Sequence, residues 1–234
     1  MAKNSGVTAN TPKNILLGAG TIHKGLELTY TLTTDTALVT GKKYYTRSGS
    51  SPDYTYTEVA SPALADISTY YEYDWNRATS LIGATSGGSK FTYTPELKDI
   101  EADGALVKGK GLTVKVGETA TFELNFLELT PEIMKMLSLG TKVESSASYS
   151  GYDEIKAKAQ IETGDYVEKL GFIGKMATGE PIVIIMDYAL CTSGLPIEGK
   201  NKDNNVSTAT FECVAELSGE LETLPWHILT KHTS

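Results

Sequence analysis

Two segments of the chain alternate strictly between apolar and polar residues, and both begin with the same five residues. The sequence Thr-Ala-Thr-Phe-Glu occurs at residues 119–123 and again at residues 208–212. Successive side chains of a β-strand point to opposite faces of a sheet, so this alternation predicts two half-buried strands. The predicted inner faces carry Ala120, Phe122, Leu124 and Phe126 in the first strand, and Ala209, Phe211, Cys213, Ala215 and Leu217 in the second.

The outward faces of the two predicted strands are polar and acidic. No Lys or Arg occurs at residues 118–132 or 206–230, so neither strand carries its own counter-charge. Such an acidic surface would repel another polyanion. The ordinary solvated face of a sheet would show the same pattern. The outward positions are Thr119, Thr121, Glu123 and Asn125 in the first strand, and Thr208, Thr210, Glu212, Glu216, Ser218, Glu220 and Glu222 in the second.

Length and charge limit the classes of function. The 234 residues suffice for one sizeable domain, or for one domain with an insertion. A net charge of -8 argues against a protein that grips nucleic acid through its phosphates. No apolar run reaches the ~20 residues of a membrane-spanning helix, and the polar start of the chain predicts no secretory signal. We therefore expect a protein made in a reducing cytoplasm, with Cys191 and Cys213 as buried thiols.

The composition changes within the first third of the chain. Residues 33–75 are rich in Tyr, Thr and Ser, and their pattern predicts a hairpin with a turn at residues 48–53. This segment reads as an insertion into a domain formed by residues 1–32 and 76–234. The polar residues 1–13 and the end of the chain at 224–234 are expected to be arms that are disordered in the free subunit.

The remaining pattern predicts antiparallel β-structure with one flanking helix. The helix is expected at residues 131–139, with Thr130 as its N-cap and Gly140 in the left-handed position that ends it. Strands are expected at residues 21–32, at 181–190 as a buried central strand, and as a hairpin of 155–161 with 166–173 across a turn at 163–165.

No motif predicts catalysis, a cofactor or a metal. Residues 83–90 (GATSGGSK) resemble a phosphate-binding loop, but the final Lys follows Ser and a strand pattern comes next, so a Gly/Ser hairpin loop is the preferred interpretation. His23, His227 and His232 show no spacing for a triad or a metal site. The carboxylates recur along whole strands, whereas a catalytic pair converges on one point. We expect no enzyme.

Several weak motifs in a fixed order resemble a known family. Residues 99–105 (DIEADGA) lead into Val107-Lys108-Gly109, the first acidic strand follows, and Leu-Thr-Pro-Glu then opens the predicted helix. Residues 14–20 (NILLGAG) fit the same order at the front of the chain. Together these features resemble the major tail tube proteins of long-tailed bacteriophages, over about residues 14–30 and 80–225.

The resemblance implies an antiparallel β-sandwich or barrel whose inner sheet joins those of its neighbours in a hexameric ring. Stacked rings would form a tail tube around an acidic lumen that conducts DNA during ejection without binding it specifically. Implied partners are other copies of the chain, the tape measure protein, and the tail tip and terminator proteins, with no membrane and no cofactor. The protein would reside in the virion tail after assembly in the host bacterial cytoplasm.

The resemblance assigns two sets of residues. The lumen-lining set is Thr121, Glu123, Asn125, Glu212, Glu216 and Glu220. The inter-subunit arm set is Asn14, Ile15, Leu16, Leu17 and Trp226.

Two alternatives remain open from the sequence. One is the inner tube of a contractile injection device, which an outer surface that contacts a sheath would distinguish. The other is a host- or carbohydrate-binding virion module, because residues 33–75 resemble a cassette (GKKYYT…YYE) of other virion proteins and present many aromatic side chains. That alternative predicts a discrete aromatic cleft and a monomer or trimer.

Overall fold

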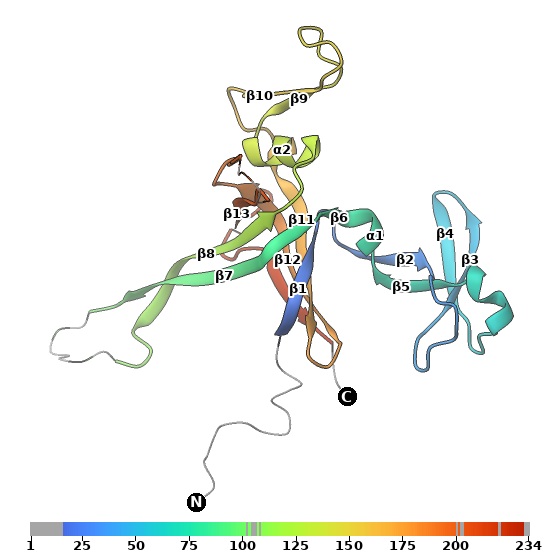
Figure 1. Cartoon of the computed structure of the whole chain (residues 1–234). Coiled ribbons are helices and arrows are strands. Elements are labelled where there is room, and N and C mark those ends of the chain that lie inside the picture. The colour runs from blue at the N-terminus through green and yellow to red at the C-terminus, as the bar shows by residue number, and fades with distance from the viewer. Residues whose placement is uncertain are drawn as a thin grey trace, which may run out of the picture. The chain divides into compact units, whose positions relative to one another are not determined.

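The computed structural model is built mainly of antiparallel β-strands (Figure 1). It describes residues 16–101, 103, 107, 109–199, 201, 204–219 and 221–231. The chain divides into two compact units, a smaller one at Leu26–Ser80 and a larger one formed by the rest. The small unit therefore extends beyond the expected insertion at residues 33–75, because residues 28–32 pair with residues 71–75 inside it.

The main sheet of the larger unit has eight antiparallel strands, in the order β6-β1-β11-β12-β13-β8-β7, with β14 also paired to β12. These strands are β1 (Leu16–His23), β6 (Leu81–Gly83), β7 (Thr85–Asp99), β8 (Thr113–Phe126), β11 (Val167–Met176), β12 (Pro181–Cys191), β13 (Ser207–Cys213) and β14 (Trp226–Thr230). As predicted, β12 is central, with β11 on one side and β13 and β14 on the other.

The two ends of this strand order are adjacent in the chain. β6 pairs with β1 at one end of the sheet, β7 pairs with β8 at the other, and Ala84 alone separates β6 from β7. The Ala84 carbonyl also accepts a hydrogen bond from the backbone N–H of Leu127, just after β8. The sheet therefore curls into a sandwich-like shape, and within the described residues it does not close into a barrel.

The core of the larger unit contains the inner faces of both alternating segments. Phe122, Leu124, Ala209 and Phe211 are at most 1% exposed, as the alternation predicted. Cys191 and Cys213 are buried free thiols, and burial raises the pKa of Cys213 to about 12. The other core side chains come from β1, β11, β12 and the helix, and include Ile22, Ile133, Leu137, Val167, Leu170, Phe172, Met186 and Ala189.

The predicted helix is α2 (Pro131–Ser138), and it packs Ile133 and Leu137 into this core. Thr130 caps it as expected, because its Oγ1 accepts a hydrogen bond from the N–H of Ile133 at 3.2 Å. The left-handed residue that ends the helix is Leu139 (φ 50°) rather than Gly140. Gly140 is instead required for space, since a Cβ there would lie 2.7 Å from the carbonyl oxygen of Lys156.

Two expected strands are arranged differently. The predicted strand at residues 21–32 is divided into β1 and β2 (Leu28–Leu32), which belong to different sheets. The predicted pairing of 155–161 with 166–173 is wrong, although the second strand is present as β11. β10 (Glu154–Lys156) pairs with β9 (Thr141–Val143), and a 3-10 turn (Thr163–Asp165) precedes β11.

The small unit contains a four-stranded antiparallel sheet in the order β2-β5-β3-β4. β3 (Tyr45–Ser50) and β4 (Asp53–Glu58) form the hairpin that the sequence predicted, and β5 is Tyr71–Trp75. A 3-10 helix (Leu64–Thr69) precedes β5 and the short α1 (Arg77–Ser80) follows it. Tyr44, Ile67 and Tyr70 are buried, and the Tyr44 hydroxyl donates to Asp35 at 2.9 Å.

Candidate functional site: an acidic sheet face

The two alternating segments are direct neighbours in the sheet. β8 and β13 pair antiparallel, with Thr121 opposite Glu212, Glu123 opposite Thr210 and Asn125 opposite Thr208. Side chains directly opposite each other in an antiparallel pair point to the same side of the sheet. The outward residues of both strands therefore form one surface, the polar face: Thr119, Thr121, Glu123, Asn125, Thr208, Thr210 and Glu212.

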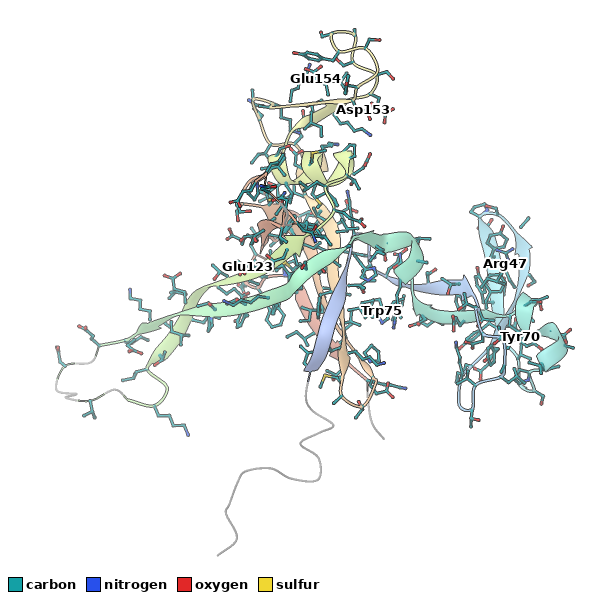
Figure 2. The ribbon with its side chains drawn as sticks, in the orientation of Figure 1. Arg47, Tyr70, Trp75, Glu123, Asp153 and Glu154 are labelled. Atoms are coloured by element: carbon teal, nitrogen blue, oxygen red, sulfur yellow. The ribbon has the colours of Figure 1, made fainter. Side chains whose placement is uncertain are left out.

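The polar face lies directly over the core. Glu123 is exposed while Phe122 and Leu124 on either side of it are buried (Figure 2 labels Glu123 on β8). Glu212 is half-buried between the buried Phe211 and Cys213. Because a shift of one residue would exchange the two sides, the buried aromatic rings fix which side chains face outward.

Side-chain hydrogen bonds tie one end of the polar face together. Thr208 Oγ1 donates to Asn125 Oδ1 at 2.7 Å, and Asn125 Nδ2 donates to the Gly88 carbonyl at 3.0 Å. Gly87 and Gly88 both have positive φ, which lets the start of β7 bulge toward Asn125. These bonds hold three strands in register at this end of the face.

The neighbouring strand β7 places a positive charge across from the first acidic strand. Lys90 of β7 stands directly opposite Glu123, so the ammonium lies on the same side of the sheet as the glutamate. The first acidic strand therefore lies next to a cation, although residues 118–132 carry none themselves. Glu212 has Leu190 of β12 opposite it instead.

The acidic surface continues across β12 onto β11. Tyr188 shares the side of Glu212 and Leu190, and it stands opposite Glu168 of β11. Its hydroxyl donates to the Glu216 carboxylate at 3.3 Å, and the negative charge of Glu216 raises the pKa of Tyr188. Glu168, Tyr188 and Glu216 border a hollow of 510 Å³. It is also lined by Tyr166, Ala215, Leu217 and Ser218. Glu168 was missed because its own sequence context does not reveal which strand it pairs with.

The second acidic strand is shorter than predicted. β13 ends at Cys213, so Glu216 lies in the segment that follows and not on the strand. Leu217, expected in the core, is 89% exposed. Glu220 lies outside the described residues.

Glu118 has a structural role on the core side of β8. Its side chain is 8% exposed, and its carboxylate receives Lys115 Nζ at 2.6 Å and the Tyr93 hydroxyl at 2.8 Å. It also accepts a hydrogen bond from the backbone N–H of Leu224, which ties the C-terminal segment to β8. Lys115 and then the Leu224 amide hold the pKa of Glu118 at about 2.

The predicted arm residues have different placements. Asn14 and Ile15 lie outside the described residues, whereas Leu16 and Leu17 pair with Met176 and Lys175 at the start of β1. Trp226 begins β14, and its ring lies 5.5 Å from Phe91 and 4.8 Å from Tyr93, centre to centre.

Residues 226–230 pair with β12 of the same chain. The expectation that residues 224–234 form a disordered arm is therefore wrong for residues 226–230. The contact of residues 14–17 with a neighbouring subunit stays a prediction.

The sequence matches no protein-family model, and no curated protein matches it. Among the described residues, no helix is long and apolar enough to cross a membrane. The same part of the chain holds no group of three or more His, Cys, Asp or Glu side chains arranged to bind a metal ion.

Proposed function

We propose that this protein is a structural subunit of the tail tube of a long-tailed bacteriophage. Its polar face would line the lumen of stacked hexameric rings. The observation that carries the proposal is that β8 and β13 pair into one continuous acidic surface, backed by the main core of the larger unit. The resemblance of residues 14–30 and 80–225 to major tail tube proteins supports the same assignment.

The charge of the polar face suits passage of DNA. Duplex DNA carries one negative charge per ~1.7 Å of its axis, so a wall rich in cations would retain it. Glu123, Glu212, Glu216 and Glu168 outnumber Lys90 on this surface, and threonines fill much of the remainder. Repeated around a ring and along a stack, these side chains would give a negative, hydroxyl-lined channel.

The β7–β8 hairpin supports assembly. Figure 1 shows it extending away from the rest of the larger unit. Beyond the core it exposes apolar side chains on both sides, Val114 and Val116 on one and Leu97 on the other. Apolar side chains held on an exposed hairpin mark a surface that another chain covers. We assign that role to a second copy in the tube.

The proposal also fixes the expected partners and place of action. The tube would enclose the tape measure protein and end at the tail tip and terminator proteins. It would act in the virion tail, with DNA passing through without specific binding. No enzymatic step is part of this function.

Electron microscopy of the concentrated, purified protein tests the proposal. We expect rings or tubes with a central hole. A protein that remains a monomer or a solid aggregate at high concentration, in the presence of tail tip protein as a nucleus, would contradict it.

A further inference from the structure

Most side chains on one face of the small unit's sheet are aromatic. Tyr30 stands opposite Tyr73, Tyr45 opposite Tyr71, and Tyr56 opposite Arg47. Because opposite residues share a side, the aromatic residues of four strands gather on one surface, the tyrosine face. Its members are Leu28, Tyr30, Leu32, Tyr45, Arg47, Tyr54, Tyr56, Glu58, Tyr71, Tyr73 and Trp75.

The rings of the tyrosine face hold one another in place. Tyr30 and Tyr56 stack at 4.0 Å with nearly parallel planes, and Tyr45 meets Tyr30 edge-on at 5.0 Å. The Arg47 guanidinium lies 4.3 Å from the ring centre of Tyr54 and 4.8 Å from that of Tyr71 (Arg47 is labelled in Figure 2). Rings already fixed in this way lose little conformational entropy when a ligand binds.

This surface is distinct from the buried aromatic pair of the same unit. Tyr44 is 1% exposed and packs 5.8 Å from the buried Tyr70, centre to centre. Tyr73 is 51% exposed, and Tyr54 is also exposed. The opposite side of the sheet carries Thr and Ser together with the carboxylates of Asp53, Glu72 and Asp74. Exposed aromatic side chains gathered on one face are typical of binding sites.

A cleft opens at the edge of the tyrosine face. Its volume is 320 Å³, and Tyr45 and Tyr73 line it together with Lys42, Lys43, Glu72 and Asp74. Lys42 forms ion pairs with Glu72 and, at 2.7 Å, with Asp35. The cleft thus places fixed ammonium donors and carboxylate acceptors beside aromatic rings.

We propose that the tyrosine face and this cleft bind a neutral polysaccharide. A sugar ring has one face of C–H groups, which packs on the negative face of an aromatic ring, and a rim of hydroxyl groups that both donate and accept hydrogen bonds. The small unit offers both kinds of partner next to each other: exposed phenol rings on the tyrosine face, and the charged ends of Lys43, Glu72 and Asp74 in the cleft at its edge. Glu72 and Asp74 reach the cleft from the other side of β5.

Charge selects a neutral polymer over an anionic one. The small unit has seven Asp and Glu against four Lys and Arg, a net charge of -3. Single-stranded nucleic acid also stacks on Tyr and Arg, but it requires a positively charged groove along its backbone. The excess of carboxylates disfavours nucleic acid and acidic glycans alike. This inference does not depend on the tail tube proposal.

The test is binding of the full-length protein to an array of neutral and acidic bacterial oligosaccharides and single-stranded DNA, followed by titration of the best neutral ligand. We expect binding to neutral glycans, weakened at least tenfold by Tyr73→Ala and by Tyr54→Ala. Thr55→Ala, on the opposite side of the sheet, is the matched control and should bind as the parent protein does. Thermal unfolding of each variant shows that the fold is kept.

Three results would overturn the inference. They are a failure to bind any neutral glycan, unchanged binding in both tyrosine variants, and a preference for DNA or acidic glycans. Loss of self-association in Tyr73→Ala without any glycan binding would identify the face as a contact between copies instead. Electron microscopy tests the tail tube proposal separately, so failure of one proposal can be told from failure of the other.

Discussion

Glu123 on β8 and Thr210 on β13 stand directly opposite each other, on the outward side of a strand pair whose inward side is fully buried. The relationship joins segments nearly 90 residues apart in the chain into one acidic surface. The buried neighbours Phe122 and Phe211 set the orientation of that surface, because they cannot turn outward without opening the core.

The inward side should carry the stability of this strand pair. Phe211→Ala removes a fully buried ring and should lower the free energy of unfolding by about 3–5 kcal/mol. The neighbouring Thr210→Ala, on the polar face, should change it by less than about 0.5 kcal/mol. Urea unfolding monitored by circular dichroism measures both, and equal losses in the two variants would contradict the assigned faces.

Glu118 should make stability depend on pH in the acid range. Its pKa is lowered to about 2 in the folded protein, so its contribution is complete above the ordinary value of 4.5 and is lost as the pH falls toward 2. Glu118→Gln should therefore lower Tm at pH 7, by about 3–8 °C for a hydrogen-bonded charged group in a chain of this size. The difference from the parent protein should shrink between pH 4.5 and pH 2. Scanning calorimetry that finds a constant difference over this range would refute the role of the charge.

The small unit should be dispensable for folding of the larger one. His23 of β1 pairs with Leu81 of β6, so a short Gly/Ser turn can replace the residues between them. Because loop length changes closure entropy slowly, we expect a Tm within about 5 °C of that of the parent protein. Circular dichroism and gel filtration provide the measurement. Insoluble or unfolded protein from this deletion would show that the division into units is wrong.

The exposed hairpin should control assembly without affecting the fold. Val116→Asp places a carboxylate where the proposed neighbour packs, and burying an unpaired charge costs several kcal/mol. Tubes should then be lost while the thermal unfolding of the subunit stays unchanged. Val39→Asp, at a similarly exposed valine of the small unit, is the control for the same chemical change. Normal tubes from Val116→Asp would exclude this surface from the interface.

The sequence predicted those features that depend on residues close together in the chain. Alternation located β8 and β13 because alternate side chains are buried, and the Thr130–Pro131 pair located α2 because the cap bond is made within one turn. The predicted strand at residues 155–161 was wrong because its alternation rests partly on Ala157 and Ala159, which bury little area and specify a face weakly.

Other features depend on contacts that are distant in sequence. The pairing of β8 with β13, the position of Lys90 opposite Glu123, and the contribution of Glu168 all follow from which strands become neighbours. The alternation at Ala215 and Leu217 continues after the chain has left the sheet at Cys213, so the pattern alone extended the strand too far. The left-handed position of Leu139 and the close approach of Lys156 to Gly140 likewise could not be predicted from the local pattern.

The rate of DNA ejection at low salt, from particles whose tails carry Glu123→Lys and Glu212→Lys, tests the central proposal most directly. Both sites are on the polar face, so the subunit should fold and assemble while the channel wall becomes cationic. We predict slowed ejection that added salt partly restores, because salt screens the attraction between lysines and phosphates. Particles with Asp53→Lys and Asp66→Lys, at exposed sites of the small unit, should eject at the parent rate. Ejection at the parent rate from the Glu123→Lys and Glu212→Lys particles would contradict a lumen lined by this face.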